Sequence, residues 1–70
     1  MVITDPATGD RVIWRGGNRI RAYDRRARLI SSIEIDENEA TDDVAREARM
    51  QVVARLLRLR RAKGRQVAAR

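Results

Sequence analysis

No glycine or proline occurs between Asp36 and Gly64, whereas the first 17 residues contain the single proline and three of the four glycines. These two residue types most often end regular elements or form turns. The uninterrupted stretch therefore predicts one long helix over residues 37–63, and the turn-rich start predicts short strands. Seventy residues suffice for one small domain, which we place over residues 1–70.

The first 36 residues alternate between β-favouring segments and turn signals. Pro6 and Gly9 lie in a short polar stretch that predicts a reversal of the chain, and Gly16-Gly17-Asn18 is typical of a tight hairpin. The segments between these turns are rich in β-branched and aromatic residues, which favour strands. We predict an antiparallel meander of three or four strands over residues 1–36, with strands at 11–15, 19–24 and 29–35 and a turn at 25–28.

Acidic residues mark the start of the predicted helix. Asp36 and Glu39 have the spacing of a capping box, and Thr41 with Asp42 and Asp43 offers a second start one turn later. Gly64 is a suitable residue just beyond the end of a helix, so residues 64–70 are expected to form a frayed basic tail. The fold class predicted is α+β: a small antiparallel meander packed on one long C-terminal helix.

Two apolar stripes run along this helix. On a helical wheel the larger stripe is expected to pack on the sheet. The second stripe, Met50, Val53 and Leu57, lies about 100° or more round from the first, at 100° per residue. It either widens the core or forms a protein interface, and we predict an interface because a small sheet can hardly cover both stripes. The larger stripe consists of Ala45, Ala48, Val52, Leu56 and Leu59, and the predicted core is Val12, Trp14, Ile20, Leu29, Ile33, Ile35, Ala48, Val52, Leu56 and Leu59.

The absence of cysteine and histidine excludes several kinds of chemistry. Without them there is no disulfide framework, thiolate nucleophile, zinc cluster or imidazole base. Ser31 and Ser32 have no histidine to activate them, and Gly16-Gly17-Asn18 lacks the Lys-Ser/Thr ending of a phosphate-binding loop. The acidic stretch at 36–43 lacks the glycine of a calcium-binding EF-hand loop. We therefore expect no enzyme activity, catalytic residue, metal, cofactor or small-molecule substrate.

Charge is distributed in blocks along the chain. The overall net charge of +6 combines +4 in residues 1–30, −6 in residues 31–47 and +8 in residues 48–70. Such blocks usually indicate a partner or self-complementary contacts, so a homo-oligomer is expected, also because so small a domain has a limited core. No apolar run approaches the length of a membrane span, and no signal-like segment follows the N-terminus. We expect no membrane association and a location in the cytoplasm or within a phage particle.

Arginine accounts for all basic residues except Lys63, a bias typical of GC-rich genomes such as those of some bacteria and their phages. It also concentrates on one side of the predicted strands. Strand alternation places Arg11 and Arg15 on one face and Arg19, Arg21 and Tyr23 on one face of the next strand. If these rows lie side by side, the surface suits duplex DNA, since guanidinium groups bind phosphates and guanine edges. An ordinary solvated sheet face is the alternative. The candidate nucleic-acid-binding residues are Arg11, Arg15, Arg19, Arg21, Tyr23, Arg25, Arg26 and Arg28.

Two resemblances accompany this pattern. The segment Tyr23-Asp24-Arg25-Arg26-Ala27-Arg28-Leu29 resembles the Y-D-x-x-G-R-L repeat of bacterial Rhs-type proteins, with Ala27 at the glycine position. The layout of a basic antiparallel sheet followed by one helix is similar to the arm-binding domain of tyrosine recombinases, and that resemblance implies a sheet that enters the major groove.

Two classes of function follow. The first is a small non-enzymatic nucleic-acid-binding protein, a regulator or recombination accessory factor, that uses the arginine-rich sheet face on duplex DNA. The alternative is a structural or adaptor protein of a larger assembly such as a phage virion, with the charge blocks and the second helix stripe as contacts to protein partners.

Overall fold

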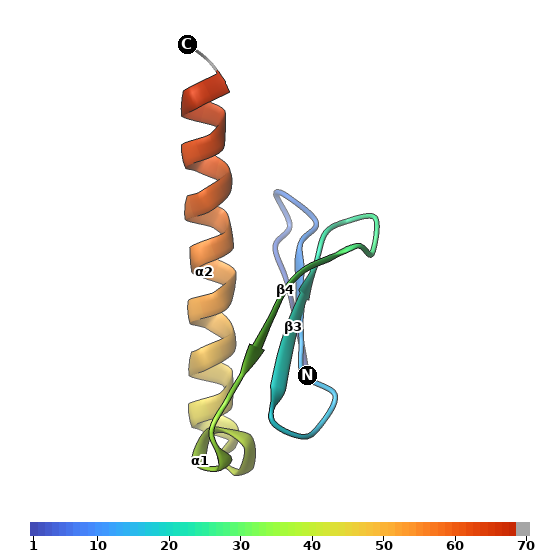
Figure 1. Cartoon of the computed structure of the whole chain (residues 1–70), viewed down its shortest axis with the longest axis vertical. Coiled ribbons are helices and arrows are strands. Elements are labelled where there is room, and N and C mark those ends of the chain that lie inside the picture. The colour runs from blue at the N-terminus through green and yellow to red at the C-terminus, as the bar shows by residue number, and fades with distance from the viewer. Residues whose placement is uncertain (69–70) are drawn as a thin grey trace.

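The computed structural model describes residues 1–68, and side chains up to residue 64. Four short strands come first and helices follow, so the α+β class is confirmed (Figure 1). The long helix runs beside the sheet and extends past it towards the C-terminus. The elements are β1 (Val2–Thr4), β2 (Arg11–Ile13), β3 (Arg19–Tyr23), β4 (Leu29–Glu34), α1 (Glu37–Thr41) and α2 (Asp43–Ala68).

The sheet is an antiparallel meander with its strands in sequence order, β1-β2-β3-β4. The predicted hairpin between β2 and β3 is present. Gly16 and Gly17 have φ angles of 107° and 73°, which L side chains rarely adopt, and the indole Nε1 of Trp14 donates to the carbonyl of Gly17 at 2.9 Å. The glycine pair therefore allows the sharp turn that brings β2 and β3 into register.

The turn between β3 and β4 is organised by Asp24. Its Oδ1 accepts hydrogen bonds from the backbone N–H groups of Arg26 (2.8 Å) and Arg28 (2.9 Å). Ala27 has a φ of 62°, in the left-handed region that favours glycine. The Y-D-x-x-G-R-L repeat of Rhs-type proteins has glycine at this position. Ala27 therefore adopts a backbone conformation that glycine would adopt without strain.

The helical region starts with the predicted capping box. The Asp36 side chain accepts from the backbone N–H of Glu39 at 2.7 Å, and the Glu39 carboxylate accepts from the backbone N–H of Asp36. Asp42 then leaves helical geometry and caps α2 by accepting from the N–H of Val44 at 2.9 Å. The prediction of one helix over 37–63 is therefore wrong in detail: α1 is a separate turn. Helix α2 also continues through Gly64 to Ala68. Within the tail expected to fray, residues 69–70 lie outside the described residues.

Helix α2 packs on the sheet through the second stripe and not, as predicted, through the larger stripe. Met50, Val53 and Leu57 expose only 0, 9 and 8% of their surface and belong to the core, so the prediction that they form a protein interface is wrong. Val52 and Leu56 expose 46 and 60% instead. Of the other core predictions, Val12, Ile20 and Ile35 are buried and Trp14 and Ile33 are half-buried, whereas Leu29, Ala48 and Leu59 are exposed.

Long-range polar contacts explain this choice of helix face. Arg46 and Arg61 lie on the same side of α2 as Met50, Val53 and Leu57, at 100° per residue. Arg46 stacks on Trp14 and Arg61 binds Asp10, so both contacts turn this side of α2 towards the sheet. The larger apolar stripe then lies at the side of the contact, where Val52 and Leu56 are partly exposed and border a groove towards β4.

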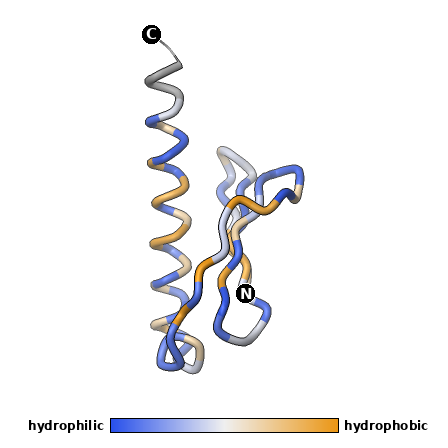
Figure 2. The backbone as a smooth tube through the Cα atoms, in the orientation of Figure 1, coloured by the Kyte–Doolittle hydropathy of each residue, from blue (hydrophilic) through white to orange (hydrophobic). Residues whose placement is uncertain are grey.

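Helix α2 packs mainly over β1 and β2. Four strands spaced about 4.8 Å apart make a sheet about 15–20 Å wide, and one helix is about 10 Å across. The helix therefore covers roughly half of the inner face. Apolar residues are visible both between the helix and the sheet and on the free side of the helix (Figure 2). Among the described helices, none is long and apolar enough to cross a membrane.

Candidate nucleic-acid interface

The strand register brings the predicted arginine rows together on the face of the sheet that is turned away from α2. Arg11 of β2 pairs with Tyr23 of β3, and Ile13 pairs with Arg21. Directly paired residues project to the same face. Since Arg19 shares that face by alternation along β3, three of the four arginines in the predicted rows lie with Tyr23 on the two central strands. Arg15, the fourth, lies beyond the end of β2. We call this set, Arg11, Arg19, Arg21 and Tyr23, the outer basic face.

Side chains on the outer basic face differ in exposure. Arg19 and Arg21 are exposed, and Arg11 and Tyr23 are half-buried. Ile13 lies among them and exposes only 9% of its surface, so this face has an apolar centre as well as a charged rim. The long apolar stems of arginine side chains suit such a surface.

Acidic groups near the outer basic face are few. Glu34 of β4 pairs with Arg19 in the register, and its carboxylate accepts a hydrogen bond from the Asn18 amide at 3.2 Å. Arg19 Nη1 donates to the Ser32 hydroxyl at 3.2 Å. In the part of the chain whose side chains are described, Arg11, Arg19 and Arg21 form no ion pair. Their positive charge is therefore available to a ligand.

The other predicted binding residues lie at the two ends of β3. Arg15 is exposed beside the β2–β3 hairpin, and Arg25 and Arg26 are exposed in the β3–β4 turn. Arg28 differs, since its Nε is 3.0 Å from the Asp24 carboxylate, which partly neutralises it. Within the described side chains, Arg15, Arg25 and Arg26 form no ion pair. These three arginines lie beyond the two ends of the outer basic face, and Arg28 is the one whose charge is partly neutralised.

Two arginines of the C-terminal helix bind the β1–β2 turn instead. Arg61 donates to both carboxylate oxygens of Asp10 at 2.5 and 2.7 Å, and Arg58 donates to Asp5 at 3.2 Å. The hydrogen bonds that Arg61 donates to the Asp10 carboxylate raise the pKa of the Arg61 guanidinium above its usual value. The backbone N–H of Ala7, together with Arg58, lowers the pKa of Asp5. These carboxylates, buried within a turn, were not recognised in the sequence as partners of the helix.

Arg46 is the most buried basic residue described and has a structural role. Its guanidinium carbon lies 3.6 Å from the centre of the Trp14 ring, its Nη1 donates to the carbonyl of Ala40 at 2.9 Å, and its Nη2 donates to Asp43. In the described structure its Nε has no hydrogen-bond partner. Arg46 therefore connects the start of α2 to β2 and to the end of α1. The sequence contained no local signal for this contact.

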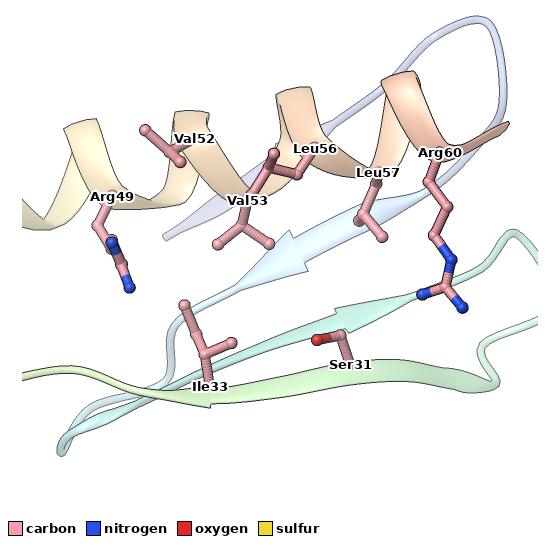
Figure 3. Close-up of a pocket in the computed structure, with 8 residues that line it drawn as sticks. All are labelled: Ser31, Ile33, Arg49, Val52, Val53, Leu56, Leu57 and Arg60. Carbon is pink, nitrogen blue, oxygen red and sulfur yellow. The ribbon is translucent and has the colours of Figure 1, made fainter. Parts of the chain in front are cut away.

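A second feature is an apolar groove between α2 and β4, of about 220 Å³. In Figure 3, Val53 and Leu57 point from the helix towards the sheet, and Arg49 and Arg60 stand at the two ends. Val52 and Leu56 form its outer wall on the helix. Ile33 and Ser31 form the β4 side.

A scan against models of protein families gave no match, and searches of curated proteins and of solved structures gave no match either. Among the residues that the structure describes, no group of three or more acidic, histidine or cysteine side chains could hold a metal ion.

Proposed function

We propose that this protein binds duplex nucleic acid, most simply DNA, through the outer basic face. The observation that carries the proposal is the register of β2 and β3, which gathers Arg11, Arg19 and Arg21 on one surface, where they form no ion pair among the described side chains. The arginines that face the other way, Arg58 and Arg61, are bound to carboxylates of the same chain.

The placement of the basic residues suits contacts to a duplex backbone. They lie on the two central strands of a sheet about 15–20 Å wide. The sheet is wider than the major groove of B-DNA, about 12 Å, so the sheet face would lie across the phosphates that border the groove. Exposed arginines at both ends of β3 could reach the phosphates on either side. Guanidinium groups bind phosphate oxygens and guanine edges through paired hydrogen bonds, which favours arginine over lysine here. Most of the affinity would come from phosphate contacts and would fall as salt rises.

Fluorescence anisotropy with a labelled duplex tests the proposal. The wild-type chain is expected to bind with a dissociation constant of about 1–100 µM near physiological salt, the range of non-specific DNA binding. Because each phosphate contact contributes about 0.9 to the slope of log affinity against log salt, Arg19→Gln with Arg21→Gln is expected to reduce that slope by about two units. The single variants Arg21→Gln and Arg55→Gln form a matched pair, since both residues are exposed and Arg55 lies on α2.

Circular dichroism would show that each variant is folded. Loss of binding in Arg21→Gln with little change in Arg55→Gln supports the outer basic face as the site. Equal losses in the two variants would mean that binding follows total charge only. A wild-type chain without salt-sensitive binding near micromolar concentration would contradict the proposal.

A structural or adaptor role is the second candidate, and one observation favours it. Val52, Leu56 and Leu59 expose about half or more of their surface along one side of α2. Exposed apolar side chains in a continuous stripe usually mark a contact with another protein. A chain that fails to bind DNA but associates through this stripe would fit the adaptor role.

A further inference from the structure

The groove between α2 and β4 lies over the part of the sheet that α2 leaves uncovered. Its floor is the inner face of β4 at Ser31 and Ile33, and its wall is the side of α2 that carries Val52 and Leu56. Because one helix covers about half of a four-stranded sheet, a second helix would fit beside α2 with its axis about 10 Å away.

We propose that the α2 helix of a second copy of this chain packs along the Val52 and Leu56 side of α2, at the outer edge of this groove, antiparallel to the first. The contact would be two-fold symmetric, with Val52 of each copy opposite Leu56 of the other. This proposal goes beyond the nucleic-acid function and does not depend on it. It replaces the interface predicted from the sequence, Met50, Val53 and Leu57, with the larger apolar stripe of the same helix.

The charge of the helical region favours a second copy as the occupant. Residues 36–47 carry six acidic side chains and one basic one, whereas residues 48–64 carry only basic charges. An antiparallel pair therefore places the acidic start of each helix beside the basic end of the other. Within the described side chains, Glu37 and Glu47 at one end and Arg60 and Lys63 at the other form no ion pair, so these charges are available.

Side-chain size along the stripe favours the same arrangement. Small residues, Ala45 and Ala48, lie on its acidic half, and long residues, Arg60 and Lys63, lie on its basic half. If Val52 is opposite Leu56, the antiparallel register places Ala48 opposite Arg60. A small side chain then faces a long one at both ends of the contact, which allows the two helices to approach closely.

Sedimentation velocity without DNA tests the association. The wild-type chain is expected to be dimeric at high micromolar concentration. Leu56→Glu is expected to weaken the dimer by about 100-fold, since two symmetry-related leucines lose their burial. Val44→Glu is the matched control, because Val44 is an exposed apolar residue of α2 that does not line the groove. It is expected to leave the dimer intact.

Introduced cysteines test the antiparallel orientation, since the chain has none of its own. A mixture of Ala48→Cys and Arg60→Cys is expected to oxidise mainly to the mixed disulfide. Prominent Ala48→Cys homodimers would show a parallel arrangement and overturn the proposed geometry. Circular dichroism checks the fold of every variant, and Leu56→Gln, a milder change, is expected to weaken the dimer if Leu56→Glu fails to fold.

Two results would overturn the second copy as the occupant. One is a wild-type chain that stays monomeric at the highest concentration. The other is a dimer that Leu56→Glu and Leu56→Gln leave unchanged. Because none of these measurements contains DNA, failure of the dimer and failure of DNA binding would be told apart.

Discussion

The Arg46 guanidinium stacks on the indole ring of Trp14, 3.6 Å from the ring centre. This contact joins the start of α2 to the strand region and lies beside the apolar core. A planar, delocalised cation over an aromatic face is favourable, and burial strengthens the attraction. Arg46, the one basic residue in the acidic segment 31–47, therefore stabilises the packing of α2 on the strands.

Replacement of Arg46 is expected to destabilise the protein. Arg46→Ala removes the stack on Trp14 and the hydrogen bond to the Ala40 carbonyl. We expect the free energy of unfolding to fall by about 2–3 kcal/mol, from one buried stack and the hydrogen bonds of a charged group. Urea unfolding monitored by Trp14 fluorescence measures this. Arg49→Ala is the control, since Arg49 is exposed and its Nε is 3.8 Å from Glu39. If Arg49→Ala lowered the free energy of unfolding as much as Arg46→Ala, the stack on Trp14 would have no special role.

The two pairs that hold the β1–β2 turn are expected to differ in strength. Asp10 with Arg61 forms two short hydrogen bonds to a buried carboxylate, whereas Asp5 with Arg58 forms one and leaves Arg58 more exposed. Double-mutant cycles with Asn and Gln are expected to give a coupling of about 1–2 kcal/mol for the first pair and below about 1 kcal/mol for the second. Equal couplings would show that the bidentate geometry adds nothing.

Acid is expected to destabilise the protein through Asp5 and Asp24. Backbone N–H donors, from Ala7 and Arg28 respectively, lower the pKa of each carboxyl below its ordinary value of 3.8 in the folded chain. The stability contributed by a lowered pKa is present above the ordinary value and is lost as the pH falls through it towards the folded value. Urea midpoints are therefore expected to stay level down to about pH 5 and to fall below about pH 4.

Asp5→Asn and Asp24→Asn should each lower stability at neutral pH and flatten the acid fall. Glu37→Gln is the control for a charge change at an exposed acidic residue of α1. An acid profile that neither aspartate variant alters would contradict the assignment.

Ala27→Gly is expected to stabilise the protein. Ala27 has a φ of 62°, a conformation that costs an L residue about 1–2 kcal/mol. Part of this gain is offset because glycine makes the unfolded chain more flexible, so a net gain of about 0.5–1 kcal/mol is expected. Gly17→Ala is the matched opposite change, since Gly17 has a φ of 73° and open space at its Cβ. It should lower stability by a similar amount, and thermal unfolding measures both.

Local signals in the sequence predicted most of the secondary structure. The glycine pair at 16–17 sets the β2–β3 hairpin, strand alternation places Arg19 and Arg21 on one face of β3, and the capping box at Asp36 starts the helical region. These features depend on residues within a few positions of each other, so composition and spacing are sufficient to recognise them. That Arg11 of β2 shares the face of Arg19 and Arg21 was established only by the strand register. The sequence indicated a second possible helix start near Asp42. It did not indicate that a separate helix, α1, ends there.

The tertiary structure alone decided which side of α2 faces the sheet. Helical periodicity places Met50, Val53 and Leu57 on one stripe and Val52 with Leu56 on another. Periodicity by itself does not determine which of the two stripes is buried against the sheet. The choice depends on contacts between residues far apart in the chain, Arg61 with Asp10 and Arg46 with Trp14. Polar groups beside a buried stripe must find partners. The buried face of α2 is therefore the one on which Arg61 binds Asp10 in the β1–β2 turn and Arg46 stacks on the indole of Trp14.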